Sequence, residues 1–246
     1  MADIGIHNGY WIGTPYEDMF SSMKAAAAAG ADVYEIETWS LYEKSVQKLH
    51  DIKKQADELG IRLICNGGFS AYNDIASDDP AIRRKGIDMA FSVLKAMETA
   101  GITSWSGINY SSWLRLPETR PFTMDDKERI LELSISSLKE IVQAAKDSGV
   151  LYCLEIVNRY EQFLINTVEE GIALIERVGS DNLKLLLDLY HMNIEEDSII
   201  ESIHYAAQRH CIGELHVGES NRRIPGTGAT HLDWPNIFGA LKEENY

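Results

Sequence analysis

The chain has 246 residues, of which 45% are hydrophobic and 25% are charged, and these proportions are ordinary for a globular protein. Acidic residues outnumber basic residues by 38 to 23, and the resulting net charge of −15 argues against nucleic acid as a partner, because a phosphate backbone is repelled. No apolar stretch approaches the ~18 residues of a membrane-spanning helix, and the first residues lack a signal-peptide pattern, so we expect neither a membrane partner nor export.

Seven short apolar runs alternate along the chain with stretches whose apolar residues recur at helical spacing. The predicted strands are residues 3–8, 32–37, 61–66, 104–109, 151–157, 183–190 and 211–217. The predicted helices are residues 22–29, 41–59, 81–100, 125–148, 167–178, 199–208 and 234–244. A glycine follows five of these helices, as is typical of a helix C-cap, and Asp233 is a predicted N-cap of the last helix.

This alternation of strand and helix predicts a parallel sheet in an α/β fold. The segment HNGYW (7–11) after the first predicted strand is too bulky for a phosphate-binding loop, and no linker divides the chain. A doubly wound sheet remains an alternative, but seven even repeats favour a single (β/α)8 TIM barrel over residues 1–246. The eighth strand is expected about where the sequence ends, so we expect a C-terminally shortened version of a longer barrel.

The three cysteines, Cys65, Cys153 and Cys211, are far apart, and each lies in an apolar run. Their spacing suits neither a disulfide framework nor a structural zinc site. We therefore expect buried free thiols in a cytoplasmic protein.

Metal-competent side chains stand near the ends of three consecutive predicted strands: Glu155, Asp188 and His216. Neighbouring strands lie about 4.8 Å apart, so side chains at their tips can converge on one cation. In such barrels the chemistry lies at the carboxyl ends of the strands. Taken singly, an acid there is more often solvated and a histidine more often part of the core. Three in succession favour a site for Mn²⁺, Mg²⁺ or Co²⁺.

Around Asp188, the leucines and Met192 are interpreted as core residues. The acidic pair Glu195 and Glu196 is interpreted as the first turn of the following helix, where the helix dipole favours negative charge.

The segments LEIVNRYE, LLLDLYHMNIEED and LHVGESNRRIPGTG together resemble the D-tagatose 3-epimerase family, which includes the D-psicose (D-allulose) and L-ribulose 3-epimerases. GFSAYNDIASDDPAIRRKGI and GINYSSW add weaker matches. The resemblance implies an isomerase with a xylose-isomerase-like TIM barrel, acting on small ketoses. It also implies a divalent metal, commonly Mn²⁺, held by Glu155, Asp188, His216 and a second Glu, with Glu155 as a catalytic acid and base.

The resemblance implies substrate contacts for Glu161, His191 and Arg222, and an apolar wall at Trp113. It makes Glu219 a supporting residue beside the histidine strand. The second Glu belongs on an eighth strand, and a homodimer or homotetramer is expected. His7 and Asn8 stand where a tyrosine or similar residue is expected, so the preferred ketose stays open.

Other functions compete with a ketose 3-epimerase. The same kind of barrel also supports aldose–ketose isomerisation and keto-inositol dehydration. An endonuclease-like repair barrel is disfavoured by the acidic charge. The hypothesis of an inactive barrel that binds a metal or a sugar also remains, because the second Glu is not found in the chain.

Overall fold

The computed structural model describes residues 2–116, 120–227 and 231–246. Its strands are β1 (Gly5–His7), β2 (Val33–Glu37), β3 (Arg62–Asn66), β4 (Ser104–Ser106), β5 (Leu151–Ile156), β6 (Leu183–Asp188) and β7 (Ile212–His216). Its helices are α1 (Met19–Ala28), α2 (Val46–Leu59), α3 (Pro80–Ala100), α4 (Met124–Asp147), α5 (Val168–Val178), α6 (Leu189–Glu195), α7 (Ile199–Gln208) and α8 (Trp234–Glu243). Two 3₁₀ turns, η1 (Asn8–Trp11) and η2 (Thr38–Ser40), follow β1 and β2.

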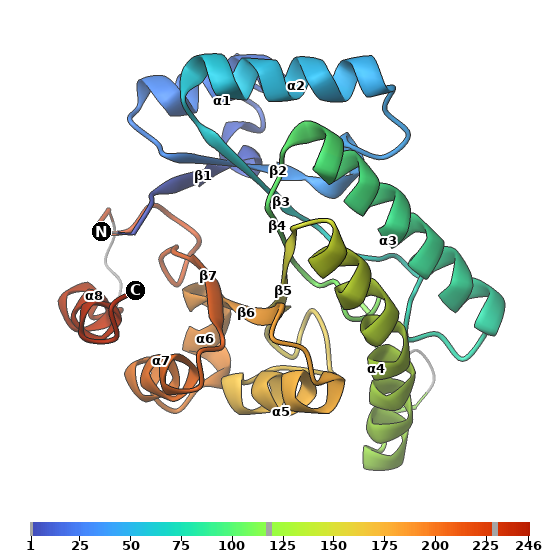
Figure 1. The fold of residues 1–246 in the computed structure, drawn as a ribbon. Helices are drawn as coiled ribbons and strands as arrows, with labels where there is room; N and C mark the ends of the chain where they lie inside the picture. Colours follow the sequence, from blue (N-terminus) through green and yellow to red (C-terminus); the bar gives the residue numbers. More distant parts are fainter. Residues whose placement is uncertain (1, 117–119, 228–230) are drawn as a thin grey trace.

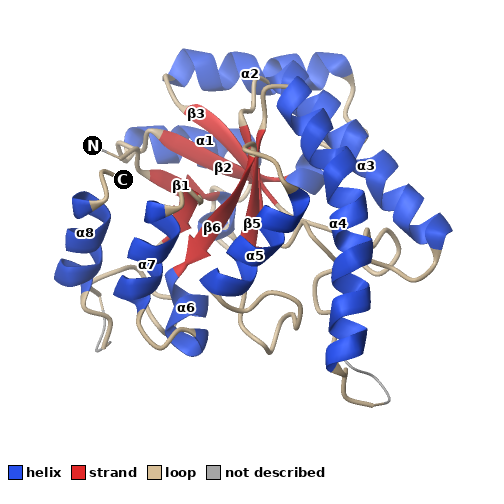
Figure 2. Cartoon of the chain, turned by 60° about the horizontal axis from the view of Figure 1, so that its bottom comes forward, coloured by secondary structure: helices blue, strands red, loops and turns tan. Residues whose placement is uncertain are grey.

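The strands form one parallel sheet in sequence order, from β1 to β7. The sheet curls on itself and the helices lie around its outside (Figures 1 and 2). In the part of the chain that the structure describes, the sheet has seven strands, and β1 and β7 are its two edges. The predicted α/β barrel is therefore confirmed.

Strand β6 shows why a strand of this barrel appears in the sequence as a continuous run of leucines. Leu185, Leu186 and Leu187 are all fully buried, since one face of the strand packs into the barrel and the other packs against the helices. Strands of parallel sheets are covered on both faces and lose the alternation of apolar and polar residues. The interpretation of these leucines and of the buried Met192 as core is confirmed.

The predicted glycine caps are confirmed, because all five glycines have a positive φ that suits glycine: Gly30, Gly60, Gly101, Gly149 and Gly179. Asp233 caps α8 by accepting a hydrogen bond from the Asn236 N–H. The second predicted helix began too early, at residue 41. In the structure α2 begins at Val46, because the Ser45 hydroxyl accepts the Lys48 N–H and caps the helix there.

The prediction for residues 183–196 was wrong in two details. Strand β6 ends at Asp188, and the short helix α6 starts at once, because the Asp188 carboxylate accepts the N–H of Tyr190 at 2.8 Å and so caps it. Glu195 and Glu196 therefore lie at the end of α6 rather than in the first turn of a helix. Each binds another segment instead: Glu195 pairs with Arg159 at 2.6 Å, and Glu196 accepts the N–H of Val168 at 2.7 Å.

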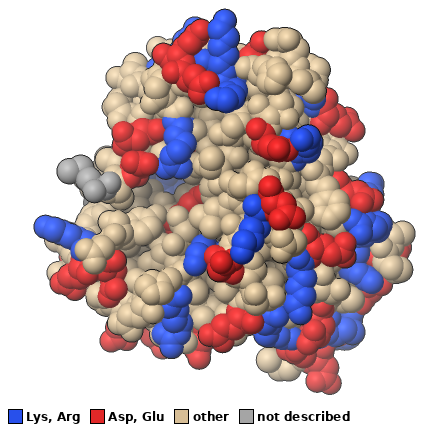
Figure 3. Space-filling model, in the orientation of Figure 1, with Lys and Arg blue, Asp and Glu red and all other residues tan. Residues whose placement is uncertain are grey.

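The predicted free thiols are confirmed, since Cys65, Cys153 and Cys211 are buried and unbridged. Within the described ranges, no helix is long and apolar enough to cross a membrane. On the face shown in Figure 3, basic side chains lie interspersed with acidic ones.

Candidate functional site

The carboxyl ends of β5, β6 and β7 bring Glu155, Asp188 and His216 to one edge of the barrel. Asp188 and His216 are partners in the register of the two strands, and the His216 Nδ1 lies 3.9 Å from an Asp188 oxygen. Ligand atoms of Glu155, Asp188 and His191 all lie within 4.8 Å of one another. Asp188 thus lies beside both Glu155 and His216, and His191 groups with Glu155 and Asp188, whereas His216 groups with Glu35 and Glu214.

A bulge in β7 sets the position of His216. Leu185 pairs with Ile212 and Leu186 pairs with Glu214, which leaves Gly213 as an extra residue without a partner. Only glycine fits there, because a Cβ would lie 2.5 Å from the Sγ of Cys153. A shift of register by one residue reverses which face each side chain occupies. The bulge therefore decides that His216 stands opposite Asp188.

Asp188 divides its two oxygens between the fold and the site. The Oδ1 atom accepts the N–H groups of Tyr190 and His191 at the start of α6, at 2.8 and 3.4 Å. The Oδ2 atom faces the imidazole of His216 at 3.9 Å. One oxygen of this buried carboxylate is thus left to face a cation.

Glu35 joins this group from the opposite side of the barrel, and sequence reasoning missed it. Glu35 is 4% exposed, and its two carboxylate oxygens lie 3.0 and 3.2 Å from the Nε2 of His216. A carboxylate only accepts hydrogen bonds, so Nε2 carries a proton and Nδ1 is the nitrogen left to face Asp188. An acid within the apolar run VYEIE of the second predicted strand was the available signal.

His191 is positioned as a hydrogen-bond donor. Its Nδ1 accepts the backbone N–H of Asn158 at 3.1 Å, and the Asn158 side-chain amide lies 2.7 Å away. Burial lowers the pKa of His191, so the ring is neutral near pH 7 and its proton is on Nε2. That N–H points into the site, where it lies 3.9 Å from an oxygen of Glu155. A protonated Nε2 suits a bond to a substrate oxygen rather than to a cation.

The buried charges of the site are crowded. Burial, opposed by His216 and reinforced by the charges of Asp188 and Glu35, raises the pKa of Glu155 to about 7. Burial lowers the pKa of His216, but Glu35, Glu155 and Asp188 outweigh it and raise this pKa to about 10. Three acids thus surround one imidazole in a buried site, and a divalent cation would balance their negative charge. The oxygen and nitrogen donors of Glu155, Asp188 and His216 fit such an ion.

The other predicted site residues lie next to this group. Glu161 accepts a hydrogen bond from Arg222 at 3.1 Å and another from the indole N–H of Trp113 at 3.2 Å. The guanidinium of Arg222 also lies 4.0 Å from the Tyr190 ring and 3.4 Å from the Nε2 of His191. Trp113 is 55% exposed, so it presents an apolar face at the mouth. The structure therefore brings together all the residues predicted to contact substrate.

The loop after β7 holds Arg222 in place through Glu219. Arg222 has a φ of 60°, a left-handed conformation that is strained for arginine. Backbone hydrogen bonds of 2.8 Å join Glu219 to both Arg222 and Arg223. The buried Glu219 carboxylate accepts the N–H of Gly226 at 2.6 Å and the indole N–H of Trp234 at 3.2 Å. These contacts fit the supporting role that the resemblance assigns to Glu219.

His7, which stands where a tyrosine was expected, ends β1 beside the site. Its ring centroid lies 6.0 Å from that of His216, and its Nδ1 accepts the Gly9 N–H at 2.9 Å.

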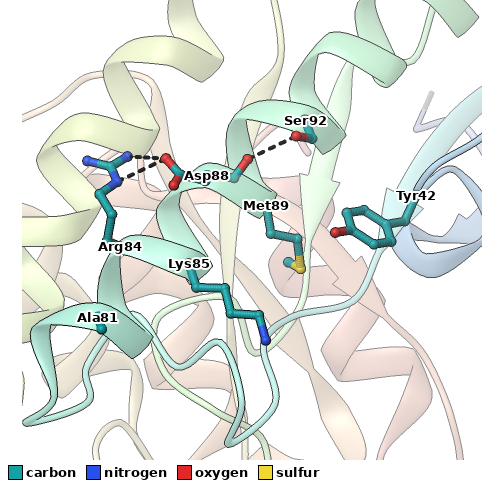
Figure 4. Close-up of a pocket in the computed structure, with 7 residues that line it drawn as sticks. All are labelled: Tyr42, Ala81, Arg84, Lys85, Asp88, Met89 and Ser92. Atoms are coloured by element: carbon teal, nitrogen blue, oxygen red, sulfur yellow. Dashed lines mark hydrogen bonds and ion pairs between the residues drawn. The ribbon is translucent and has the colours of Figure 1, made fainter.

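A pocket of about 420 Å³ on the outside of the barrel is a poorer candidate (Figure 4). It lies between Tyr42 and the exposed side of α3, and none of its lining residues belongs to the strand ends. Its Arg84 pairs with Asp88 at 2.9 Å and with Glu140 at 3.1 Å, so the protein itself compensates this charge.

Comparison with known proteins places this geometry in a family. The profile of the xylose isomerase-like TIM barrels matches residues 23–246. The D-psicose 3-epimerase of Ruminiclostridium cellulolyticum is 35% identical over 242 residues, which cover 98% of this chain and 80% of that protein. The chain belongs to the xylose isomerase-like TIM barrel family, among its ketose 3-epimerases. The predicted resemblance is thereby confirmed, and so is the prediction of an isomerase.

Other relatives among these 3-epimerases agree. The L-ribulose 3-epimerase of Mesorhizobium japonicum is 34% identical over 247 residues, which cover 100% of this chain and 79% of that protein. A crystal structure of D-psicose 3-epimerase in the presence of D-fructose superposes with a TM-score of 0.91 at 32% identity, over 100% of this chain and 82% of that one.

Proposed function

We propose that this chain is a metal-dependent 3-epimerase of free ketoses, of the D-tagatose/D-sorbose, D-fructose/D-psicose or L-ribulose class. The observation that carries the proposal is that Asp188 lies beside both Glu155 and His216 at the ends of three neighbouring strands, close to the pair formed by Glu161 and Arg222. Relatives with D-psicose and L-ribulose 3-epimerase activity support it.

Epimerisation at C3 removes a weakly acidic proton beside the C2 carbonyl and returns it from the other face. A divalent cation held by Glu155, Asp188 and His216 would supply Lewis acidity for this step. We propose Mn²⁺, with Mg²⁺ or Co²⁺ as alternatives.

Residues of the chain itself transfer the proton and bind the sugar in this proposal. Glu155 is suited to accept the C3 proton on its own face of the sugar and, in the reverse direction, to donate a proton from that face. The Nε2–H of His191 and the guanidinium of Arg222 donate hydrogen bonds to sugar oxygens where negative charge develops. Trp113 covers the far carbons of the sugar.

Proton return from the opposite face needs a second acid. The resemblance assigns it to a Glu on an eighth strand, and the sheet of the described residues has seven strands. Glu155 therefore serves one face in this proposal. We further propose a cytoplasmic homodimer or homotetramer, by analogy with the family.

Deuterium exchange tests the proposal. The chain is stripped with EDTA, reloaded with Mn²⁺, Mg²⁺ or Co²⁺, and incubated in D₂O with D-fructose, D-tagatose and L-ribulose. We expect metal-dependent deuterium at C3, seen by NMR, and its loss in Glu155→Gln. Deuterium at C1 would favour an aldose–ketose isomerase. Metal binding without exchange at any carbon would favour a binding protein.

A further inference from the structure

The contact between Glu35 and His216 joins two strands that are not neighbours in the sheet. Glu35 lies on β2 and His216 ends β7, 181 residues later in the chain. Both oxygens of the buried carboxylate lie within 3.2 Å of Nε2. The contact therefore crosses the interior of the barrel and faces the side of His216 that is turned away from Asp188.

We propose that Glu35 is a positioning residue that keeps His216 protonated on Nε2 and directs Nδ1 at the cation. This inference rests on the proposed metal site. A ring nitrogen can bind a cation only through a free lone pair, and the hydrogen bond made by the other nitrogen decides which one is free. A carboxylate partner also fixes the plane of the ring and increases its basicity as a ligand.

A buried hydrogen-bond chain holds Glu35 in turn. The fully buried hydroxyl of Ser106 on β4 donates to Glu35 at 3.2 Å, and the side-chain amide of Asn66, at the end of β3, donates to Ser106 at 3.2 Å. The amide of Asn66 also favours the ionised form of Glu155 and so acts to lower the pKa of that carboxyl. One network of side chains from β2, β3 and β4 thus supports both Glu155 and His216.

Glu214 offers a matched control. Its carboxylate lies on the same strand as His216, within 4.8 Å of ligand atoms of Glu35 and His216, yet it accepts a hydrogen bond from Ser104 instead. Glu35, Glu214 and His216 could also form a second cation site by themselves. The number of cations bound per chain separates that arrangement from a positioning role.

Isothermal titration of the metal-free chain with Mn²⁺ tests the inference. We expect one Mn²⁺ per chain in the wild type, an affinity about 10- to 100-fold lower in Glu35→Gln, and no change in Glu214→Gln. Glu35→Asp, whose shorter side chain draws the carboxylate back from Nε2, is expected to weaken binding as well. Circular dichroism of each metal-free variant confirms that it is folded, and Glu35→Asp serves as the test if Glu35→Gln is not.

A tautomer measurement completes the test. In the wild type loaded with diamagnetic Mg²⁺, long-range ¹H–¹⁵N spectra are expected to show the His216 proton on Nε2. Equal Mn²⁺ affinity in the wild type, Glu35→Gln and Glu35→Asp would overturn the inference and leave the proposed function intact. Two Mn²⁺ per chain, with one lost in both Glu35→Gln and Glu214→Gln, would also overturn it. No Mn²⁺ binding by the wild type would instead refute the metal site itself.

Discussion

Asp188 and His216 stand opposite each other at the ends of β6 and β7, with 3.9 Å between the carboxylate Oδ2 and the imidazole Nδ1. The other oxygen of Asp188 caps α6, and the other nitrogen of His216 binds Glu35. Each residue therefore has one polar atom engaged with the protein and one turned toward its neighbour. A cation placed between them would meet two donors that are already oriented.

Replacing Asp188 by asparagine is expected to remove metal binding and activity together while keeping the fold. The asparagine oxygen can still accept the Tyr190 N–H and cap α6, but the negative charge facing His216 is lost. Titration with Mn²⁺, C3 exchange and circular dichroism measure the three properties. Metal-dependent turnover retained in Asp188→Asn would contradict the proposed ligand set.

Replacing Arg222 is expected to weaken sugar binding and spare the metal. Asparagine is the better substitution, because it tolerates the left-handed backbone at this position. Loss of a hydrogen bond to a charged group, about 1.5–3 kcal/mol, corresponds to a kcat/KM roughly 10- to 150-fold lower. The neighbouring Arg223, an exposed residue, gives the matched control Arg223→Asn, which is expected to leave kcat/KM unchanged. Loss of Mn²⁺ from Arg222→Asn would show that its role is misassigned.

Metal affinity is expected to rise with pH in two regimes. Burial raises the pKa of Glu155 to about 7, and the surrounding acids raise that of His216 to about 10 against the effect of burial. Below pH 7 a cation must displace a proton from each residue, so the logarithm of the affinity gains about two units per pH unit. Between pH 7 and 10 only His216 still loses a proton, and the slope falls to about one. Titrations at several pH values measure it, and a flat profile would exclude Glu155 and His216 as ligands.

Adding a methyl group at Gly213 is expected to disturb both stability and the metal site. The new Cβ would lie 2.5 Å from the Sγ of Cys153 and 2.8 Å from the Cβ of Lys184, so β7 must shift. Overpacking of this kind costs about 1–3 kcal/mol, measured by denaturant unfolding, and the shift moves His216. Gly239→Ala is the control, since its Cβ meets nothing within 4 Å in α8 and helix propensity favours alanine. Unchanged Mn²⁺ affinity in a folded Gly213→Ala would show that the bulge does not set the site.

Local patterns allowed much of the fold to be predicted. The glycine caps mark helix ends because glycine takes a positive φ at little cost, and β6 reads as a strand because its leucines are buried on both faces. The exact end of β6 was missed, since the apolar pattern continues past Asp188 while the strand stops where that carboxylate caps α6.

Long-range contacts could not be predicted in the same way. Glu35 was overlooked because its partner His216 lies 181 residues away, and a single acid in an apolar strand does not reveal which group it faces. Substrate contacts of Arg222 and Glu161 were implied by family resemblance alone, and their pairing with each other was not predicted, since it depends on the path of a loop held by Glu219. The bulge at Gly213 leaves no pattern in the sequence that distinguishes it from a regular strand.

The cap that Asp188 places on α6 has a consequence for substrate range. Because His191 lies in the first turn of that helix, its distance from Asp188 is set by rigid helical geometry and varies little. The positions of Asp188 and His191 are thus coupled, and this segment offers little freedom to accommodate a longer or shorter sugar. We expect adaptation to different ketoses to arise instead in the flanking loops that carry Trp113 and Arg222.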